Sequence, residues 1–150
     1  WSARGISWQL DLNSVTVVSD EELLSHVWMN IIQNAIKFSP ENAVIEVRVF
    51  ATDTATVEIT DHGIGMDDAT GIKPEDINRI FDRFYQADRS RKQEGVGLGL
   101  CLVKRILDML GGTVSVDSRP GEGSTFRIHV PFRPKYDEAA HTGEREGKSP

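Results

Sequence analysis

The stretch SDEELLSHVWMNIIQNAIKF, residues 19–38, decides the fold of this chain, because it has the pattern of one long amphipathic helix. Ser19 or Asp20 can cap its first turn, and the acidic pair Glu21–Glu22 suits the positive end of a helix dipole. Apolar residues then recur at the spacing of a single buried helix face, and the pattern ends near Phe38. These apolar residues are Leu24, Val27, Trp28, Ile31 and Ala35.

Alternating apolar and polar residues on both sides of this helix predict strands. Run 6–10 precedes the helix with this alternation, and run 15–18 is a second short stretch of residues that favour strands. Each is expected to form a short strand. Runs 45–49 and 57–60 follow it and are typical of an antiparallel hairpin.

The second half of the chain repeats the mixture of helices and strands. Pro74 is expected to open a short helix through Phe81, and the polar segment 83–96 is expected to be a mobile loop. A further helix ends at Gly111–Gly112, and a closing hairpin follows. Strands mixed with helices without regular alternation predict an α+β fold, a two-layer sandwich with one mostly antiparallel sheet covered by helices on one face. The last helix carries the apolar stripe Leu98, Leu102, Ile106 and Met109, and the closing hairpin joins runs 113–116 and 125–130.

Composition limits the classes of protein that this chain can belong to. Its 150 residues suit one domain, and 39% hydrophobic with 27% charged residues is typical of a globular protein. A net charge of -6 argues against binding nucleic acid or an anionic membrane. The single cysteine, Cys101, excludes an internal disulfide and lies in an apolar run that predicts burial.

We expect one domain over residues 1–132 and a flexible polar tail over residues 133–150. The tail has almost no large apolar residues, and its basic and acidic side chains cancel. Trp1 is followed by neither a basic region nor an apolar leader, so the start is expected to be a cut point inside a longer protein.

Three polar side chains share one flank of the first helix. Asn30, Asn34 and Lys37 are four and three residues apart, which places them within an arc of roughly 60° at 3.6 residues per turn. An asparagine oxygen suits Mg²⁺, which takes most of its other ligands from water and phosphates. A magnesium-phosphate site and an ordinary solvated helix face both fit this stripe.

The motif Asp61-His62-Gly63-Ile64-Gly65 comes directly after a predicted strand. Its glycines allow the backbone to approach a ligand closely, and its carboxylate can accept a hydrogen bond from an exocyclic amino group. A plain turn could have the same composition, so the motif alone leaves both interpretations open.

The motif Gly95-Val96-Gly97-Leu98-Gly99-Leu100 leads directly into the last helix. Backbone N–H groups at a helix start form a ready anion site. The motif is not a Walker loop, because no Lys-Ser/Thr pair follows, and it is not a dinucleotide fingerprint, because no strand precedes it. A glycine-rich hinge without a ligand is the alternative interpretation.

Taken in order, these motifs resemble the catalytic ATP-binding domain of two-component sensor histidine kinases. That domain belongs to the superfamily of gyrase, heat-shock chaperone, histidine kinase and mismatch-repair ATPases. The resemblance implies a Bergerat-type sandwich with a mixed sheet of about five strands, three helices on one face and a mobile ATP lid. The matching motifs are the N box at 30–39, the first glycine box at 61–65, the F box at 80–85, the second glycine box at 95–100 and the final glycine box at 121–126.

The resemblance also implies Mg-ATP binding and a role for each matched residue. Asn34 would ligate Mg²⁺, while Asn30 and Lys37 would assist the phosphates. Asp61 would accept the adenine amino group, and Phe38 would pack on the adenine face. The other cofactor-binding residues would be Gly63 and Gly65 beside the base, Gly95, Gly97, Leu98, Gly99 and Leu100 near the phosphates, Thr125 reaching the adenine pocket through water, and Arg89 in the lid.

Two features depart from the family pattern. Gln86 stands where many members carry an arginine that approaches the terminal phosphate. Arg89, Arg91 or Lys92 would have to take its place. Residues 66–73 lengthen the link that follows the first glycine box, and a variable surface loop is the expected structure there.

The implied function is that of an ATP-dependent protein-histidine kinase. The γ-phosphoryl group would pass to a histidine of a separate dimerisation and phosphoacceptor domain, with a response regulator as the indirect partner. No nucleic acid or direct membrane contact is expected, and the setting is cytoplasmic. The alternatives are a related superfamily ATPase, an anti-sigma-type protein-serine kinase and a non-catalytic nucleotide-binding interaction module. None of the four histidines, His26, His62, His129 and His141, has the sequence context of a phosphoacceptor.

Overall fold

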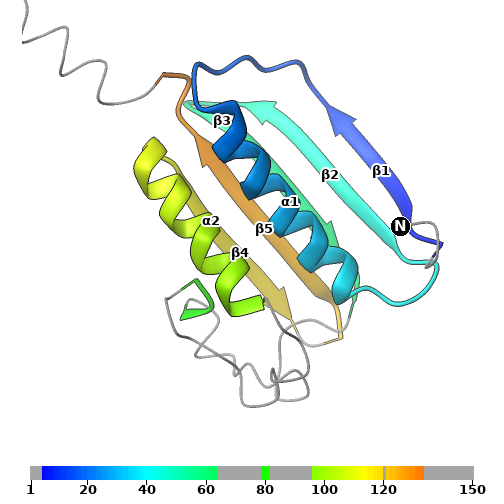
Figure 1. The fold of residues 1–150 in the computed structure, drawn as a ribbon. Coiled ribbons are helices and arrows are strands. Elements are labelled where there is room, and N and C mark those ends of the chain that lie inside the picture. Colours follow the sequence, from blue (N-terminus) through cyan, green and yellow to red (C-terminus); the bar gives the residue numbers. More distant parts are fainter. Residues whose placement is uncertain (1–4, 64–78, 82–95, 120, 134–150) are drawn as a thin grey trace, which may run out of the picture.

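The computed structural model describes residues 5–63, 79–81, 96–119 and 121–133. No helix of the described residues is both long and apolar enough to cross a membrane. The helices and strands follow one another along the ribbon of Figure 1. In chain order they are β1 (Ser7–Leu12), α1 (Glu21–Lys37), β2 (Val44–Ala51), β3 (Ala55–Asp61), α2 (Val96–Leu110), β4 (Thr113–Arg119) and β5 (Gly123–Val130).

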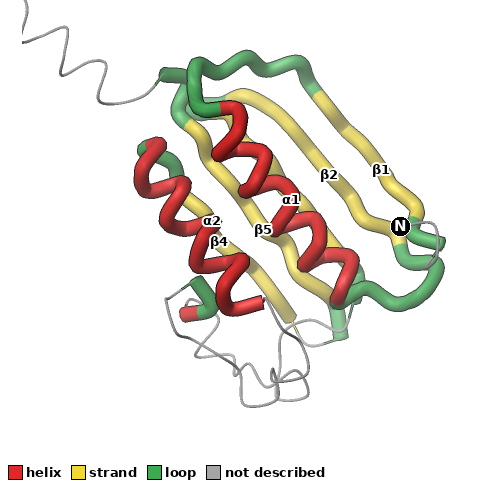
Figure 2. Tube along the Cα trace, in the orientation of Figure 1, coloured by secondary structure: helices red, strands yellow, loops and turns green. Residues whose placement is uncertain are grey.

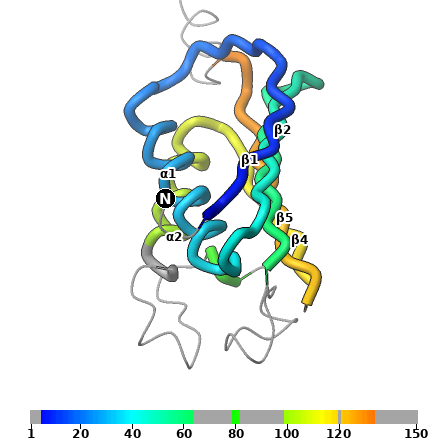
Figure 3. Tube along the Cα trace, turned by 90° about the vertical axis from the view of Figure 1, so that its right-hand side faces the viewer, coloured from blue at the N-terminus to red at the C-terminus, as the bar shows by residue number. Residues whose placement is uncertain are grey.

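The strands form one five-stranded sheet in the order β1-β2-β3-β5-β4. Only β1 and β2 run parallel, and the other neighbouring pairs are antiparallel, so the sheet is mixed. Both helices lie on the same face of the sheet, as Figure 2 shows by type of element and Figure 3 shows from the side. The predicted two-layer α+β sandwich is therefore confirmed.

Helix α1 begins and ends as its sequence predicts. The carboxylate of Asp20 accepts a hydrogen bond from the Leu23 amide at 3.0 Å and so caps the first turn. At the other end, the Phe38 amide donates to the Asn34 carbonyl, and the Ser39 hydroxyl donates to the Ala35 carbonyl at 2.7 Å. The capped end fixes Phe38 directly after the helix.

The hydrophobic core lies between the helices and the sheet. Alternate residues of β5, from Phe126 to Val130, point into it and are almost fully buried. The ring of Phe81 packs edge-on against Phe126 with centroids 6.2 Å apart. Cys101 is also buried, as its apolar surroundings predict. The helices contribute Val27, Ile31, Val103, Ile106 and Leu107 from above.

The outer face of the sheet is polar, and neither described helix covers it. Glu58 on β3 accepts a hydrogen bond from Arg127 on β5 at 3.1 Å and lies 3.6 Å from Arg48 on β2. The Nδ1 atom of His129 lies 3.0 Å from the hydroxyl of Thr56. This face therefore has a cross-strand row of ion pairs and hydrogen bonds, whereas the opposite face carries the core.

Two sequence-based predictions need comment. Residues 15–18 do not form a strand, although the Val18 amide donates to the Phe132 carbonyl at 2.8 Å and both Val15 and Val17 are half-buried. Of the third expected helix only residues 79–81 lie within the described part of the chain, where they form a short turn. The lid, the insertion at 66–73 and the tail from residue 134 lie outside the described residues.

Candidate nucleotide-binding site

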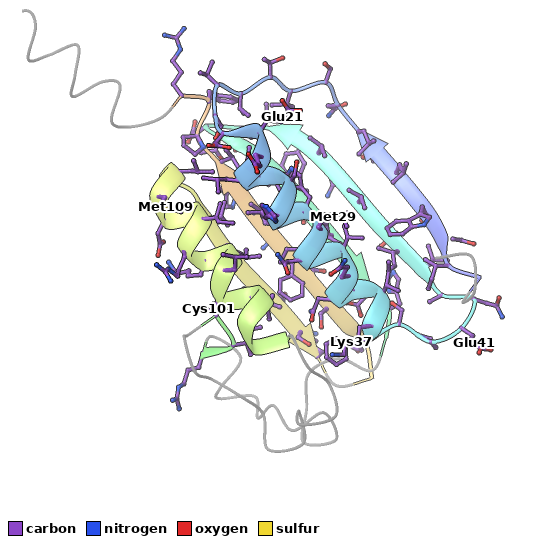
Figure 4. All side chains as sticks on the ribbon, in the orientation of Figure 1. Glu21, Met29, Lys37, Glu41, Cys101 and Met109 are labelled. Atoms are coloured by element: carbon purple, nitrogen blue, oxygen red, sulfur yellow. The ribbon has the colours of Figure 1, made fainter. Side chains whose placement is uncertain are left out.

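Most of the described candidate residues gather at one end of the sandwich. The end of α1, the end of β3, the start of α2 and the start of β5 meet there (Figure 1). Figure 4 labels Lys37 at this end of α1 and Met29 nearer the middle of the same helix. The antiparallel pairing of β3 with β5 places Asp61 directly opposite Ser124.

Asp61 is a buried carboxylate held by backbone amides. Asp61 is only 2% exposed, and its Oδ1 atom accepts a hydrogen bond from the Gly63 amide at 3.0 Å. Burial raises the pKa of Asp61, while the amides of Gly63 and Ser124 and the nearby ring of His62 limit that rise. A buried carboxylate that is fixed in this way suits a neutral hydrogen-bond donor, such as an exocyclic amino group, better than a charged partner.

Gly63 brings the end of β3 against the end of α1. A Cβ atom at residue 63 would collide with the carbonyl oxygen of Phe38, so only glycine allows this approach. The close approach places Phe38 beside the Asp61–Gly63 turn. Phe38 and Asp61, the two residues to which the family resemblance gives an adenine-binding role, therefore lie close to each other.

Ser124, which the sequence reasoning did not name as a candidate, lies directly opposite Asp61. It is 6% exposed beside Asp61, and its hydroxyl lies 2.8 Å from that of Ser118. The predicted residue Thr125 lies instead on the outer face of the sheet, where its hydroxyl contacts that of Thr60 at 3.0 Å. The alternation of β5 could have shown this, because Phe126 points inward and Thr125 must then point outward.

Asn30 contacts the start of α2. Its Nδ2 atom donates to the His26 carbonyl at 2.7 Å, and its Oδ1 atom faces Gly99, where a Cβ would lie only 2.8 Å away. Asn30, on the polar flank of α1, therefore lies against the start of α2.

Asn34 and Lys37 lie further along the same helix. Asn34 is 7% exposed, and burial lowers the pKa of Lys37. In the described part of the chain, no group of three or more His, Cys, Asp or Glu residues could hold a metal ion. A neutral amide oxygen without a carboxylate cage fits Mg²⁺ that takes its remaining ligands from phosphates and water.

The first turn of α2 supplies backbone N–H groups. Helix α2 begins at Val96, and its first turn contains no acidic residue that would compete for an anion. Gly97, Leu98 and Gly99 belong to this turn, but Leu100 is 1% exposed and packs in the core. Gly65, Arg89 and Gly95 lie outside the described residues.

The chain is similar to one family of known proteins. Residues 19–134 match the model of the histidine kinase-, DNA gyrase B- and HSP90-like ATPases. The sensor-like histidine kinase SenX3 of Mycobacterium tuberculosis (strain ATCC 25618 / H37Rv) is 38% identical over 136 residues, which are 89% of this chain and 31% of that protein. The chain thus spans about a third of the length of this curated relative.

Solved structures agree with this similarity. The mycobacterial sensor histidine kinase MprB matches with a TM-score of 0.74 and 29% identity, over 89% of this chain and 88% of that chain. Full-length ShkA in complex with AMPPNP matches with a TM-score of 0.68 and 28% identity, over 87% of this chain and 26% of that chain.

Proposed function

This chain belongs to the family of histidine kinase-, DNA gyrase B- and HSP90-like ATPases, and from that membership we propose that it binds Mg-ATP and phosphorylates a histidine of a separate acceptor domain. The observation that carries the proposal is the position of buried Asp61 beside Phe38, at the end of the helix that bears Asn34 and Lys37. In our proposal Asp61 accepts a hydrogen bond from the adenine base, and the neighbouring flank with Asn34 and Lys37 binds the phosphates.

The adenine base binds where β3 ends. The Asp61 carboxylate accepts a hydrogen bond from the exocyclic amino group, and the Ser124 hydroxyl adds a second polar contact from β5. Phe38 covers one face of the ring. Because Gly63 has no side chain, the base can lie close to the backbone in this part of the site.

The phosphates lie along α1 toward the start of α2. Lys37 contributes a positive charge whose lowered pKa reflects partial loss of water, which strengthens its interaction with an anion. The N–H groups of the first turn of α2 bind phosphate oxygens. Asn34 would hold Mg²⁺, which would neutralise part of the charge of the phosphates.

In the transfer step, a ring nitrogen of the acceptor histidine forms a bond to the γ-phosphorus while the bond from that phosphorus to the bridging oxygen of ADP breaks. The proton of the histidine passes to a base of the acceptor domain. This chain positions the nucleotide and stabilises its charge, and these two effects account for most of the catalysis of phosphoryl transfer.

The acceptor lies outside this chain in our proposal. SenX3, which shares the family, is about three times as long as the matched region, and a phosphoacceptor domain is the part that a kinase of this type needs in addition. A response regulator receives the phosphoryl group afterwards. Since ATP is a cytoplasmic substrate, the proposed setting is the cytoplasm.

Transfer in trans tests the proposal. The dimerisation bundle of the full-length protein is mixed with this chain and ATP labelled at the γ-phosphate, and we expect label on the bundle that is lost in acid and kept in base. Asn34→Ala should abolish transfer, whereas Gln33→Ala, a change at the neighbouring exposed position, should leave it intact. Circular dichroism melts show whether both variants fold.

Each alternative function predicts a different result. Acid-stable label would indicate a protein-serine kinase, and release of ADP without transfer would indicate an ATPase of the same superfamily. Failure to bind Mg-ATP in calorimetry would indicate a non-catalytic interaction module. Any of these results would overturn the proposed histidine kinase activity.

A further inference from the structure

An apolar cavity of about 460 Å³ lies between α1 and the sheet, on the flank of α1 that faces away from α2. Trp28 and Ile32 form its α1 wall, and Val47 and Val57 form its floor on β2 and β3. Asn30, which faces Gly99 on α2, marks the opposite flank of the helix. The cavity is therefore separate from the candidate nucleotide site.

The lining of this cavity offers one polar side-chain group, the indole N–H of Trp28. Every lining residue is a valine, leucine, isoleucine, alanine or tryptophan. The backbone groups of the floor are paired across the sheet, since Val47 lies opposite Ile59 and Val49 lies opposite Val57. Among the described residues no buried side-chain nitrogen or oxygen lacks a hydrogen bond. No group in the cavity therefore requires a polar occupant.

The size of the cavity is that of a ligand site and not of a packing defect. Native interiors contain few voids larger than a water molecule. Pockets for small molecules measure roughly 300–1,000 Å³. This cavity is partly open to solvent, and its apolar lining offers water few hydrogen bonds, so an apolar guest can replace that water.

Exposed apolar residues flank the cavity on the side of β1. Leu10 and Leu12 are 58% and 56% exposed, and they stand beside Val47 and Val49 on the same face of the sheet. Val15 and Val17 line the cavity from the segment that follows β1. An apolar molecule would meet apolar surface along this whole approach.

From these observations we infer that the space beneath α1 is a binding site for an uncharged, apolar small molecule, of aliphatic or aromatic character. A charged ligand is excluded because the lining has no counter-ion and its one polar side-chain group is the neutral indole N–H of Trp28. A protein partner fits less well, because the inner wall reaches Ile59 on the central strand, which is only 1% exposed. The occupant has to enter between the two layers.

Binding of two uncharged probes tests the inference. N-phenyl-1-naphthylamine is titrated into the chain while its fluorescence is followed, and 1-decanol is then added as a competitor. We expect saturable binding, displacement by 1-decanol and no displacement by Mg-ATP. Displacement by Mg-ATP alone would place the probe in the nucleotide site and overturn the inference.

A matched pair of variants locates the probe. Val57→Phe fills the cavity and should weaken binding by about tenfold, which corresponds to about 1.4 kcal/mol. Val44→Phe adds the same ring on the outer face of β2, where Val44 is 39% exposed, and should bind as the unsubstituted chain does. Equal binding by all three chains would overturn the inference.

A measurement on the unsubstituted chain keeps the test independent of whether Val57→Phe folds. Addition of 1-decanol should shift the methyl resonances of Ile32 and Val47 in a carbon–proton correlation spectrum. Shifts confined to other residues would contradict the site. Sedimentation that shows a dimer dispersed by 1-decanol would identify a second copy as the occupant and would equally overturn the small-molecule assignment.

Discussion

Asn30 and Gly99 hold the two helices of the sandwich in direct contact. The Oδ1 atom of Asn30 occupies the space that a side chain at residue 99 would need, 2.8 Å from the position of its Cβ. The Nδ2 atom of the same amide is bound to the His26 carbonyl at 2.7 Å. This contact therefore fixes the first turn of α2, whose N–H groups we propose to bind the phosphates, relative to α1.

Gly99→Ala should weaken ATP binding more than it changes the free energy of unfolding. The added methyl group displaces the Asn30 amide from His26, so we expect ATP affinity to fall about tenfold, or about 1.4 kcal/mol. The free energy of unfolding should change by less, because alanine favours a helix by about 1 kcal/mol over glycine and offsets the crowding. Calorimetry and urea unfolding measure the two quantities. The double variant with Asn30→Ala should lose no more affinity than the weaker-binding single variant, and additive losses would contradict the contact.

Ser124→Ala and Thr125→Ala form a matched pair that tests the face of β5 used by the nucleotide. Ser124 is buried beside Asp61, so loss of its hydroxyl should weaken ATP binding several-fold, as expected for a hydrogen bond worth about 1 kcal/mol. Thr125 contacts Thr60 on the outer face, so its replacement should leave affinity unchanged. The reverse order of effects in calorimetry would support the sequence-based assignment of Thr125.

The sequence predicted the elements well because their patterns are local. The cap at Asp20 and the apolar face from Leu24 to Ala35 are enough to define α1, and the alternation in residues 45–49 and 57–60 is enough to define a hairpin. Residues 15–18 are also residues that favour strands, but they do not form one, since pairing depends on a neighbour that the pattern cannot reveal. The parallel partnership of β1 with β2 is likewise a long-range property.

The candidate site could be predicted in composition but not in detail. The motifs located Phe38, Asp61 and Gly63, which the structure brings together. The contact between Asn30 and Gly99 depends on how two distant helices pack, and the burial of Leu100 depends on which way the start of α2 is rotated. No local pattern contains that information, and the cavity beneath α1 arises from packing between layers in the same way.

Gly123→Ala should destabilise the fold more than Gly121→Ala. Both glycines have positive φ, 98° and 76° respectively, so both substitutions introduce backbone strain of about 1–2 kcal/mol. A Cβ at residue 123 would also collide with the backbone carbonyl of Asp61, whereas no atom lies within 4 Å of a Cβ at residue 121. Urea unfolding should therefore show the larger loss for Gly123→Ala, together with weaker ATP binding because Asp61 is displaced. Equal losses of stability would contradict the close approach of β5 to Asp61.

The pH dependence of stability should report the burial of Asp61. Burial raises the pKa of this carboxyl in the folded chain above its ordinary value near 4, so the folded state holds the proton more tightly than the unfolded state. Between the pKa of the unfolded state and that of the folded state, the free energy of unfolding then falls as pH rises. Above both pKa values, the folded state bears the full cost of the buried charge. Asp61→Asn cannot titrate, so its stability relative to the unsubstituted chain should increase from pH 3 to pH 7 in urea unfolding, even though its ATP affinity falls. A relative stability that decreases over that range would mean that the amides of Gly63 and Ser124 outweigh burial, and that Asp61 stabilises the fold as well as binding the nucleotide.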